Sequence, residues 1–202
     1  MRDIGLFIIF VRDCFVRIEG WKITFQNFLD ESIKLGVNSV AIVAIISTFT
    51  GAVSAIQTAF NLEAPYIQDF VIAMVVRDTV FSLIPTLMAL VFAGKGGSQI
   101  SGELGTMQVT EQISALEVMG INAKSFLVLP KLAASLLVLP MLIIIGVFLA
   151  ILGGYITVVA VDIISASDYV KGIRMQFNPF IITVILVKSV AFGFIVAAIG
   201  SF

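Results

Sequence analysis

Three carboxylates lie in the long polar stretch of this chain, at Glu103, Glu111 and Glu117. A surface carboxylate can accept charge-assisted hydrogen bonds from the lysine or arginine side chains of another protein. Leu116 and Met119 lie close by in the sequence and would offer apolar contacts to the same partner. These residue types therefore suggest a surface on which a partner protein docks.

A second group of charges lies within otherwise apolar stretches, namely Arg77, Asp78 and Lys188. A charged side chain that faces lipid costs free energy, so these residues are expected to have a structural or functional role. Arg77 and Lys188 could attract a lipid phosphate near the outer face of the membrane. Alternatively, they snorkel, or they pair with Asp78 or with an acidic residue of an outer loop. We favour this structural interpretation.

Little remains from which a catalytic or metal site could be built. The chain has no His and one Cys, Cys14, which excludes zinc sites made of several His or Cys residues and mechanisms that need a histidine base. The glycines at 94, 96 and 97 lack the spacing of a phosphate-binding loop. With a net charge of −1, the chain has no basic excess for nucleic acid. We therefore expect no catalysis, no metal and no cofactor in this chain.

The composition indicates an all-α membrane protein. Hydrophobic residues make up 59% of the 202 residues, and charged residues make up 12%. An average soluble domain has roughly 45–50% apolar and about 25% charged residues. About 20 apolar residues in a helix cross the hydrocarbon core. On this basis four transmembrane helices are predicted, at about residues 35–60, 70–93, 132–160 and 178–202.

Small residues recur at every fourth position in the third predicted span, at Gly146, Ala150 and Gly154. Such a ridge lets another helix approach closely. The alternative is that these residues simply face lipid.

Residues 1–34 mix basic and aromatic side chains, which suits a helix lying at the membrane surface. A poorly ordered extension is the alternative. Lys and Arg are concentrated in residues 1–34 and 94–131 and are sparser in the two loops of the opposite side. By the positive-inside rule, both segments and the N-terminus face the cytoplasm, and Cys14 lies on the reducing side.

Residues 94–131, between the second and third spans, are too polar to cross a bilayer. Within them we predict one amphipathic helix from Glu103 to Met119, with Gly120 as its natural stop. Such a helix could be a lever on which a motor protein pushes, or it could merely seal the inner membrane surface. The residue types alone leave both alternatives open.

Three runs follow one another closely in this segment: Gly102-Glu103-Leu104-Gly105-Thr106-Met107, Val109-Thr110-Glu111-Gln112-Ile113 and Ala115-Leu116-Glu117-Val118-Met119-Gly120. Shorter runs lie outside them: Arg77-Asp78, Ala93-Gly94-Lys95-Gly96-Gly97-Ser98, Leu129-Pro130-Lys131, and Lys188-Ser189 with Phe192-Gly193. Together they resemble the signature of the MlaE-type permeases, the membrane subunits of bacterial ABC transporters for phospholipids and related lipids. The likeness covers residues 35–202 and favours the lever interpretation.

The chain departs from the family pattern at several positions. Asp78 stands where the family has Glu, and Lys95 and Lys131 stand where Arg is common, which keeps the charge but loses the bidentate geometry of Arg. Family members usually continue into a glycine-rich cytoplasmic loop and a fifth span. We therefore expect this chain to be shortened relative to the family.

The resemblance implies a homodimeric, multi-pass permease of the bacterial cytoplasmic (inner) membrane. An ABC ATPase subunit on the cytoplasmic side would bind ATP and Mg²⁺, and an MCE-domain lipid-binding protein would lie outside. The cargo would be phospholipid or a related lipid. The residues implied to couple the permease to the ATPase are Glu103, Gly105, Thr106, Met107, Thr110, Glu111, Gln112, Leu116 and Glu117. The alternative function is a membrane scaffold or channel bundle without a motor.

Overall fold

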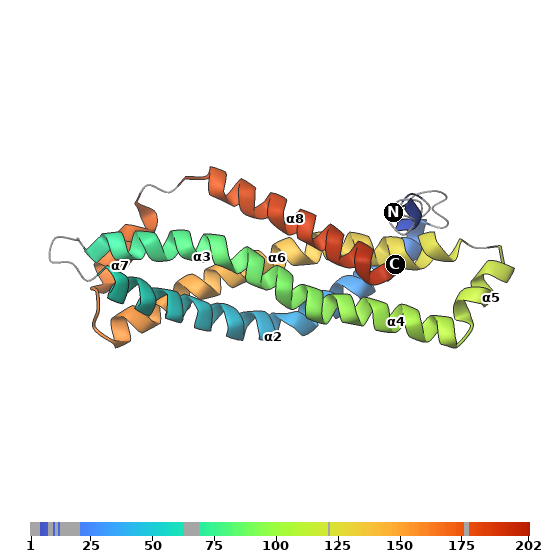
Figure 1. The fold of residues 1–202 in the computed structure, drawn as a ribbon, viewed down its shortest axis with the longest axis horizontal. Helices are drawn as coiled ribbons and strands as arrows, with labels where there is room; N and C mark the ends of the chain where they lie inside the picture. Colours follow the sequence, from blue (N-terminus) through green and yellow to red (C-terminus); the bar gives the residue numbers. More distant parts are fainter. Residues whose placement is uncertain are drawn as a thin grey trace. The chain divides into compact units, whose positions relative to one another are not determined.

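The computed structural model describes residues 5–7, 10, 12, 21–62, 69–120, 122–175 and 178–202. These residues form helices and contain no strand, so the predicted all-α class is confirmed. The helices, shown in Figure 1, are α2 (Trp21–Asn61), α3 (Asp69–Phe92), the π-helix η1 (Ala93–Gly97), α4 (Ser98–Val109), α5 (Gln112–Val118), α6 (Ala123–Ala160), α7 (Ala166–Arg174) and α8 (Phe180–Ser201).

Four helical stretches of the described residues are long and apolar enough to cross a membrane, as predicted. They are Thr24–Asn61, Phe70–Val109, Ser125–Ala160 and Phe180–Ser201. Since a crossing needs about 20 residues, the first three are longer than a bilayer requires. Part of each of these three helices must therefore project beyond the hydrocarbon core.

The helices extend beyond the predicted spans because nothing in the sequence ends them there. No Gly or Pro separates residue 21 from residue 35, so residues 21–34 join α2 instead of forming a separate surface helix. Most of the rest of the predicted surface segment, including Cys14, lies outside the described residues. α3 likewise continues through η1 into α4, and the glycine-rich run Ala93–Gly97 widens the helix to a π-turn without breaking it.

The helices contribute to two compact units, which we describe separately. The first unit consists of Met1–Ser39, Ala89–Leu139 and Val190–Phe202. The second unit consists of Val40–Met88 and Pro140–Ser189.

In the second unit, α2 and α6 approach each other at backbone distance. A Cβ atom added to Gly51 would lie 1.8 Å from the carbonyl oxygen of Ala150, and one added to Gly153 would lie 2.3 Å from that of Thr48. At Gly146 an added Cβ would lie 2.9 Å from the Ser47 hydroxyl. Of the two alternatives left open by the sequence, the small-residue ridge therefore packs against a neighbouring helix and does not face lipid.

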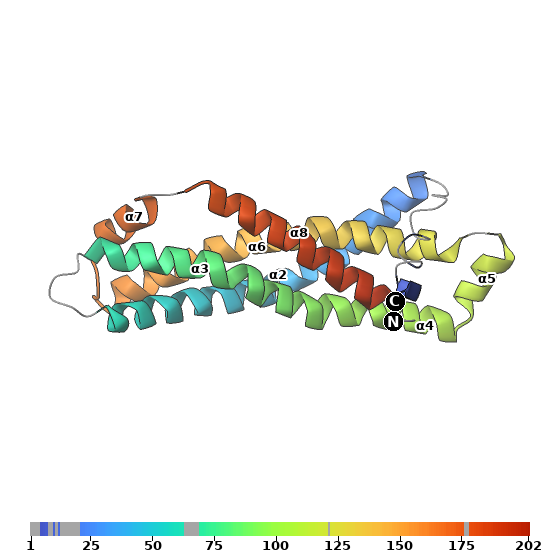
Figure 2. The same ribbon diagram turned by 45° about the horizontal axis from the view of Figure 1, so that its top comes forward.

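The short helix α7 also belongs to the second unit, and two ribbon views place it beside the beginning of α3 (Figures 1 and 2). Ser165 begins it by accepting a hydrogen bond from the backbone N–H of Asp168 at 3.2 Å. The Tyr169 hydroxyl donates to the carbonyl oxygen of Ile151 at 3.0 Å. An added Cβ at Gly172 would lie 2.2 Å from the carbonyl oxygen of Phe70, so α7 lies tightly against α3.

In the first unit, the end of α8 packs against η1, α4 and α6. The Ser101 hydroxyl donates to the carbonyl oxygen of Gly200 at 2.7 Å, and the Ser135 hydroxyl donates to that of Gly193 at 3.1 Å. An added Cβ at Gly200 would lie 3.2 Å from the carbonyl oxygen of Gly97. Glycines on α8 thus allow close packing, which holds the start of α4 in place.

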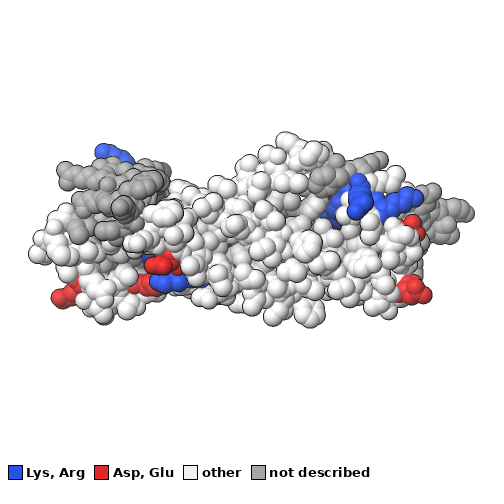
Figure 3. Space-filling model, turned by 180° about the vertical axis from the view of Figure 1, so that it is seen from behind, with Lys and Arg blue, Asp and Glu red and all other residues white. Residues whose placement is uncertain are grey.

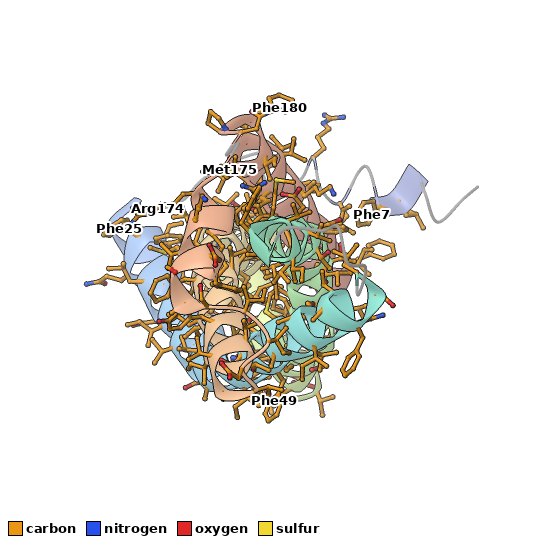
Figure 4. The ribbon with its side chains drawn as sticks, turned by 90° about the vertical axis from the view of Figure 1, so that its left-hand side faces the viewer. Phe7, Phe25, Phe49, Arg174, Met175 and Phe180 are labelled. Carbon is orange, nitrogen blue, oxygen red and sulfur yellow. The ribbon has the colours of Figure 1, made fainter. Side chains whose placement is uncertain are left out.

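Large apolar side chains cover much of the exposed surface of the long helices. Phe49 on α2 and Phe180 on α8, both in the second unit, project outward (Figure 4). On the face drawn in Figure 3, Lys, Arg, Asp and Glu cover only a small part of the visible surface. Such a surface suits lipid and is poorly suited to water.

Candidate functional site

The α4–α5 segment, residues 98–120, contains most of the residues implied to couple to a partner. The predicted single helix from Glu103 to Met119 is wrong, because the segment forms two helices. Backbone N–H groups at Thr110 and Glu111 bond back to the carbonyl oxygens of Thr106 (3.0 Å) and Gln108 (3.2 Å). Glu111 then adopts a left-handed conformation with φ of 58°, which ends α4 and redirects the chain into α5.

Most of the segment is accessible in this chain. α5 contains no buried residue. Val109, the last residue of α4, is 84% exposed, and Val118, the last residue of α5, is 88% exposed. Met107 and Leu116 are half-buried. The other implied coupling residues, apart from Glu103, are exposed: Gly105, Thr106, Thr110, Glu111, Gln112 and Glu117. Exposed apolar groups beside carboxylates are a combination that protein interfaces use.

Two glycines of the segment have different surroundings. Gly120 has φ of +80°, a conformation that glycine adopts readily, and it follows the end of α5 as predicted. An added Cβ at Gly105 meets no atom of the chain within 4 Å. Among the described residues, therefore, no neighbouring segment approaches Gly105 closely.

Glu103 differs from the other implied coupling residues because its carboxylate has partners within the chain. It pairs with Lys131 of α6 and lies 3.8 Å from Lys34 of α2. Lys131 also pairs with Glu31 at 2.8 Å, and Glu31 lies 3.6 Å from Lys34. We call Glu31, Lys34, Glu103 and Lys131 the charge cluster.

The charge cluster was not predicted from the sequence. Glu103 was assigned to a partner, Lys131 was considered only as a position of the family pattern, and Glu31 was not singled out. A signal was present, since a lysine that begins a long apolar stretch is expensive unless it is paired. Its partners could not be identified, because Glu31 and Glu103 lie far from Lys131 in the sequence.

Arg77 is held by groups of the second unit. Its side chain is 3% exposed, and its Nε donates to Oδ1 of Asp78 at 3.0 Å. Its Nη1 donates to the carbonyl oxygens of Ile173 (3.1 Å) and Met175 (2.6 Å). These carbonyls lie at the C-terminus of α7, where Figure 4 shows Arg174 and Met175, and a cation there also suits the helix dipole. This geometry supports the structural interpretation for Arg77.

Asp78 and Lys188 remain exposed and line one pocket of the second unit. The pocket has a volume of about 230 Å³. Its remaining lining residues are Phe81, Ser82, Ile181, Val184 and Ile185. α3 and α8 thus place a carboxylate and an ammonium on the wall of a largely apolar cavity. Such an arrangement can hold a molecule that has both a charged headgroup and an apolar part.

Among the described residues, no group of three or more His, Cys, Asp or Glu side chains could hold a metal ion. The candidate functional features are therefore the α4–α5 segment, the charge cluster and the pocket with Asp78 and Lys188.

Comparison with known proteins places these features in context. The family model described as "Permease MlaE" matches residues 28–202. A probable ABC transporter permease protein of Rickettsia bellii is 30% identical over 201 residues, which cover 100% of this chain and 78% of that protein. One from Synechocystis is 30% identical over 186 residues, covering 92% and 71%. The chloroplastic protein TRIGALACTOSYLDIACYLGLYCEROL 1 of Arabidopsis thaliana is 29% identical over 185 residues, covering 92% and 53%.

Proposed function

The chain belongs to the MlaE family of ABC transporter permeases, and from that premise we propose that it moves phospholipid or a related lipid across or between membranes. A separate ABC ATPase subunit would bind ATP and Mg²⁺ and supply the energy. The permease itself would catalyse no reaction, since it contributes the path of the lipid and the surface on which the ATPase acts.

The observation that carries this proposal is the α4–α5 segment. It lies beyond the predicted second span, has carboxylates at Glu111 and Glu117 and exposes Val109 and Val118 almost completely. A helix that only sealed the membrane surface would turn its apolar groups toward the lipid on one face and its charges away from it. A bent pair of helices with apolar side chains at its ends is better suited to a protein partner.

The pocket lined by Asp78 and Lys188 supports a lipid as the cargo. Lys188 would attract a phosphate group, and Asp78 would attract an amine such as that of a zwitterionic headgroup. The apolar side chains Phe81 and Ile185 line the same pocket and would contact acyl chains. The Arabidopsis relative is named after a glycerolipid, which agrees with a lipid cargo.

The remaining parts of the proposal follow from the family. The permease would form a homodimer in the bacterial cytoplasmic membrane, with its N-terminus in the cytoplasm. An MCE-domain protein would receive or deliver lipid on the opposite side. The exposed apolar side chains of α2 and α8 provide surface for a second copy and for lipid.

The test is charge reversal in the α4–α5 segment, with Glu111→Lys and Glu117→Lys made separately. Both residues are exposed, and among the described residues neither forms an ion pair within the chain, so we expect normal membrane insertion and a reduced amount of co-purified ATPase. Asp30→Lys is the matched control, because Asp30 is an exposed carboxylate on α2 outside the segment. If both variants retained the ATPase in full, the docking role would be wrong, and a scaffold or channel without a motor would become the better assignment.

A further inference from the structure

The charge cluster joins three helices of the first unit through one side chain. Lys131 on α6 bonds to Glu31 on α2 at 2.8 Å and to Glu103 on α4. Gln99, one turn before Glu103 on α4, lies 3.5 Å from the same glutamate and helps to orient it. A displacement of α4 therefore acts directly on the Lys131 ammonium, and through it on Glu31.

Stability alone does not account for this arrangement. The Lys131 side chain is 3% exposed and that of Glu31 is 12% exposed, while Oε2 of Glu31 is buried without a hydrogen-bond partner. Taking such charges out of water is expensive, and replacing a buried ion pair by apolar residues of similar volume is often neutral or stabilising. The best-attested use of buried ionic groups is to specify one arrangement of helices over another.

Glu103 also lies within reach of a second ammonium group. Besides the buried Lys131, Glu103 faces the more exposed Lys34 at 3.8 Å. If α4 shifted, Glu103 could stay paired with Lys34 while Lys131 kept Glu31. A change between these two pairings would be the kind of discrete rearrangement by which packed proteins pass on a motion.

We propose that Lys131 is a positioning residue that transmits movement of the α4–α5 segment to α2 and α6 through its ion pairs with Glu103 and Glu31. This inference rests on the proposed function, since the movement would come from an ATPase bound to that segment. It assigns Glu103 to the internal linkage and leaves Glu111 and Glu117 to contact the partner.

The test uses the permease co-purified with its ATPase subunit and reconstituted into phospholipid vesicles that contain a fluorescent phospholipid. The quantities measured are ATPase retained, ATP hydrolysed and lipid moved per ATP. We compare Glu103→Gln, Glu31→Gln and Lys131→Met with the conservative variant Lys131→Arg. Asp30→Asn is the matched control, because it removes an exposed carboxylate from α2 next to Glu31 without touching the cluster. Lys131→Arg keeps the charge if Lys131→Met does not fold.

We expect Glu103→Gln to retain the ATPase and its hydrolysis but to lower the lipid moved per ATP by between about twofold and thirtyfold. Lys131→Arg, which can still pair with both glutamates, should keep more of the lipid moved per ATP than Lys131→Met, whereas Asp30→Asn should match the unaltered protein. A merely structural role would lower the amount of folded complex and leave the ratio of lipid to ATP unchanged, and that result would overturn the inference. Absence of any ATPase from the unaltered complex would instead overturn the proposed function.

Discussion

The short helices α7 and α5 each connect two long helices, but they differ in how many of their side chains and helix ends are buried or hydrogen-bonded within the chain. α7 buries Tyr169 and Gly172, is capped at its start by Ser165 and is held at its end by Arg77. α5 buries nothing, and Glu111, the N-cap residue that precedes it, makes no capping hydrogen bond through its side chain. The contacts of α7 are therefore completed within its own unit, whereas those of α5 are not.

This difference in burial indicates that α5, and not α7, is suited to contact a partner protein. Apolar side chains and helix ends that a chain leaves uncovered at the tip of a connecting segment cost free energy unless something else covers them. Val109 at the end of α4 and Val118 at the end of α5 are 84% and 88% exposed, whereas Val170 of α7 and the adjoining Met175 are 42% and 40% exposed. α7 thus has the features of a fixed strut, and α5 those of a contact surface.

The largest expected effect on stability comes from removing the hydrogen bonds that hold α7 in place. Arg77→Met would leave the carbonyl oxygens of Ile173 and Met175 without their donor, and we expect a loss of about 3 kcal/mol of unfolding free energy. Thermal unfolding in detergent measures the loss, and hydrogen exchange should show α7 opening first. Arg77→Lys keeps the charge but not the forked geometry, so its effect should be intermediate. If α7 of Arg77→Met remained fully protected from hydrogen exchange, Arg77 would not be the residue that holds α7.

Alanine substitutions at two glycines, one in α7 and one in α4, should change the stability in opposite directions. Gly172→Ala places a Cβ 2.2 Å from the carbonyl oxygen of Phe70, and should cost about 1–3 kcal/mol because α7 must move away from α3. Gly105→Ala meets no atom of the described residues within 4 Å and should stabilise α4 by about 0.5–1 kcal/mol. Unfolding midpoints of the two variants give both signs. Equal effects would mean that α7 is no more tightly packed than α4.

The pH dependence of α7 gives a third test. Burial raises the pKa of Tyr169 to about 12, above its ordinary value of 10.0. The folded state holds this proton more tightly than the unfolded state, so the stabilisation is fully present below pH 10 and is lost as the pH rises toward 12. Tyrosinate absorbance and hydrogen exchange of α7 should change together over this range. Tyr169→Phe, which lacks the hydroxyl, should abolish the pH-dependent step, and an unchanged transition in that variant would exclude Tyr169 as its cause.

The smallest effect on stability is expected at the exposed end of α5. Val118→Ser removes an almost fully exposed apolar group, so the unfolding free energy should change by no more than about 0.5 kcal/mol. The amount of ATPase retained on purification should nevertheless fall, because Val118 would lie in the interface. A large loss of stability would show that Val118 is covered by this chain itself. Unchanged retention would remove it from the docking surface.

The long apolar helices could be predicted from composition alone, but their ends could not. Uncharged stretches longer than a bilayer's thickness have few alternatives to a spanning helix, so four of them were recognisable. The helical extension of α2 to residue 21 depends on the absence of a breaker, a weaker signal than hydrophobicity. The break at Glu111 was missed because a glutamate with positive φ has no sequence signature, unlike Gly120.

For the charged residues, too, some properties could be predicted from the sequence and others could not. Their membership of the family signature was readable, since it depends only on the order of residues along the chain. Which carboxylate faces outward and which is paired inside was not readable. Glu103 and Glu111 belong to the same polar run, yet Glu103 pairs with Lys131 and Glu111 is exposed.

The sequence by itself determined that this protein is an all-α membrane permease of the MlaE family, because hydropathy and a long local motif need no partner to be recognised. Only the tertiary structure decided that Arg77 holds α7 and that Lys131 joins α2, α4 and α6. The physical reason is that an ion pair or a capping bond depends on a few ångströms of separation. Such a separation arises only when distant segments of the chain have packed together.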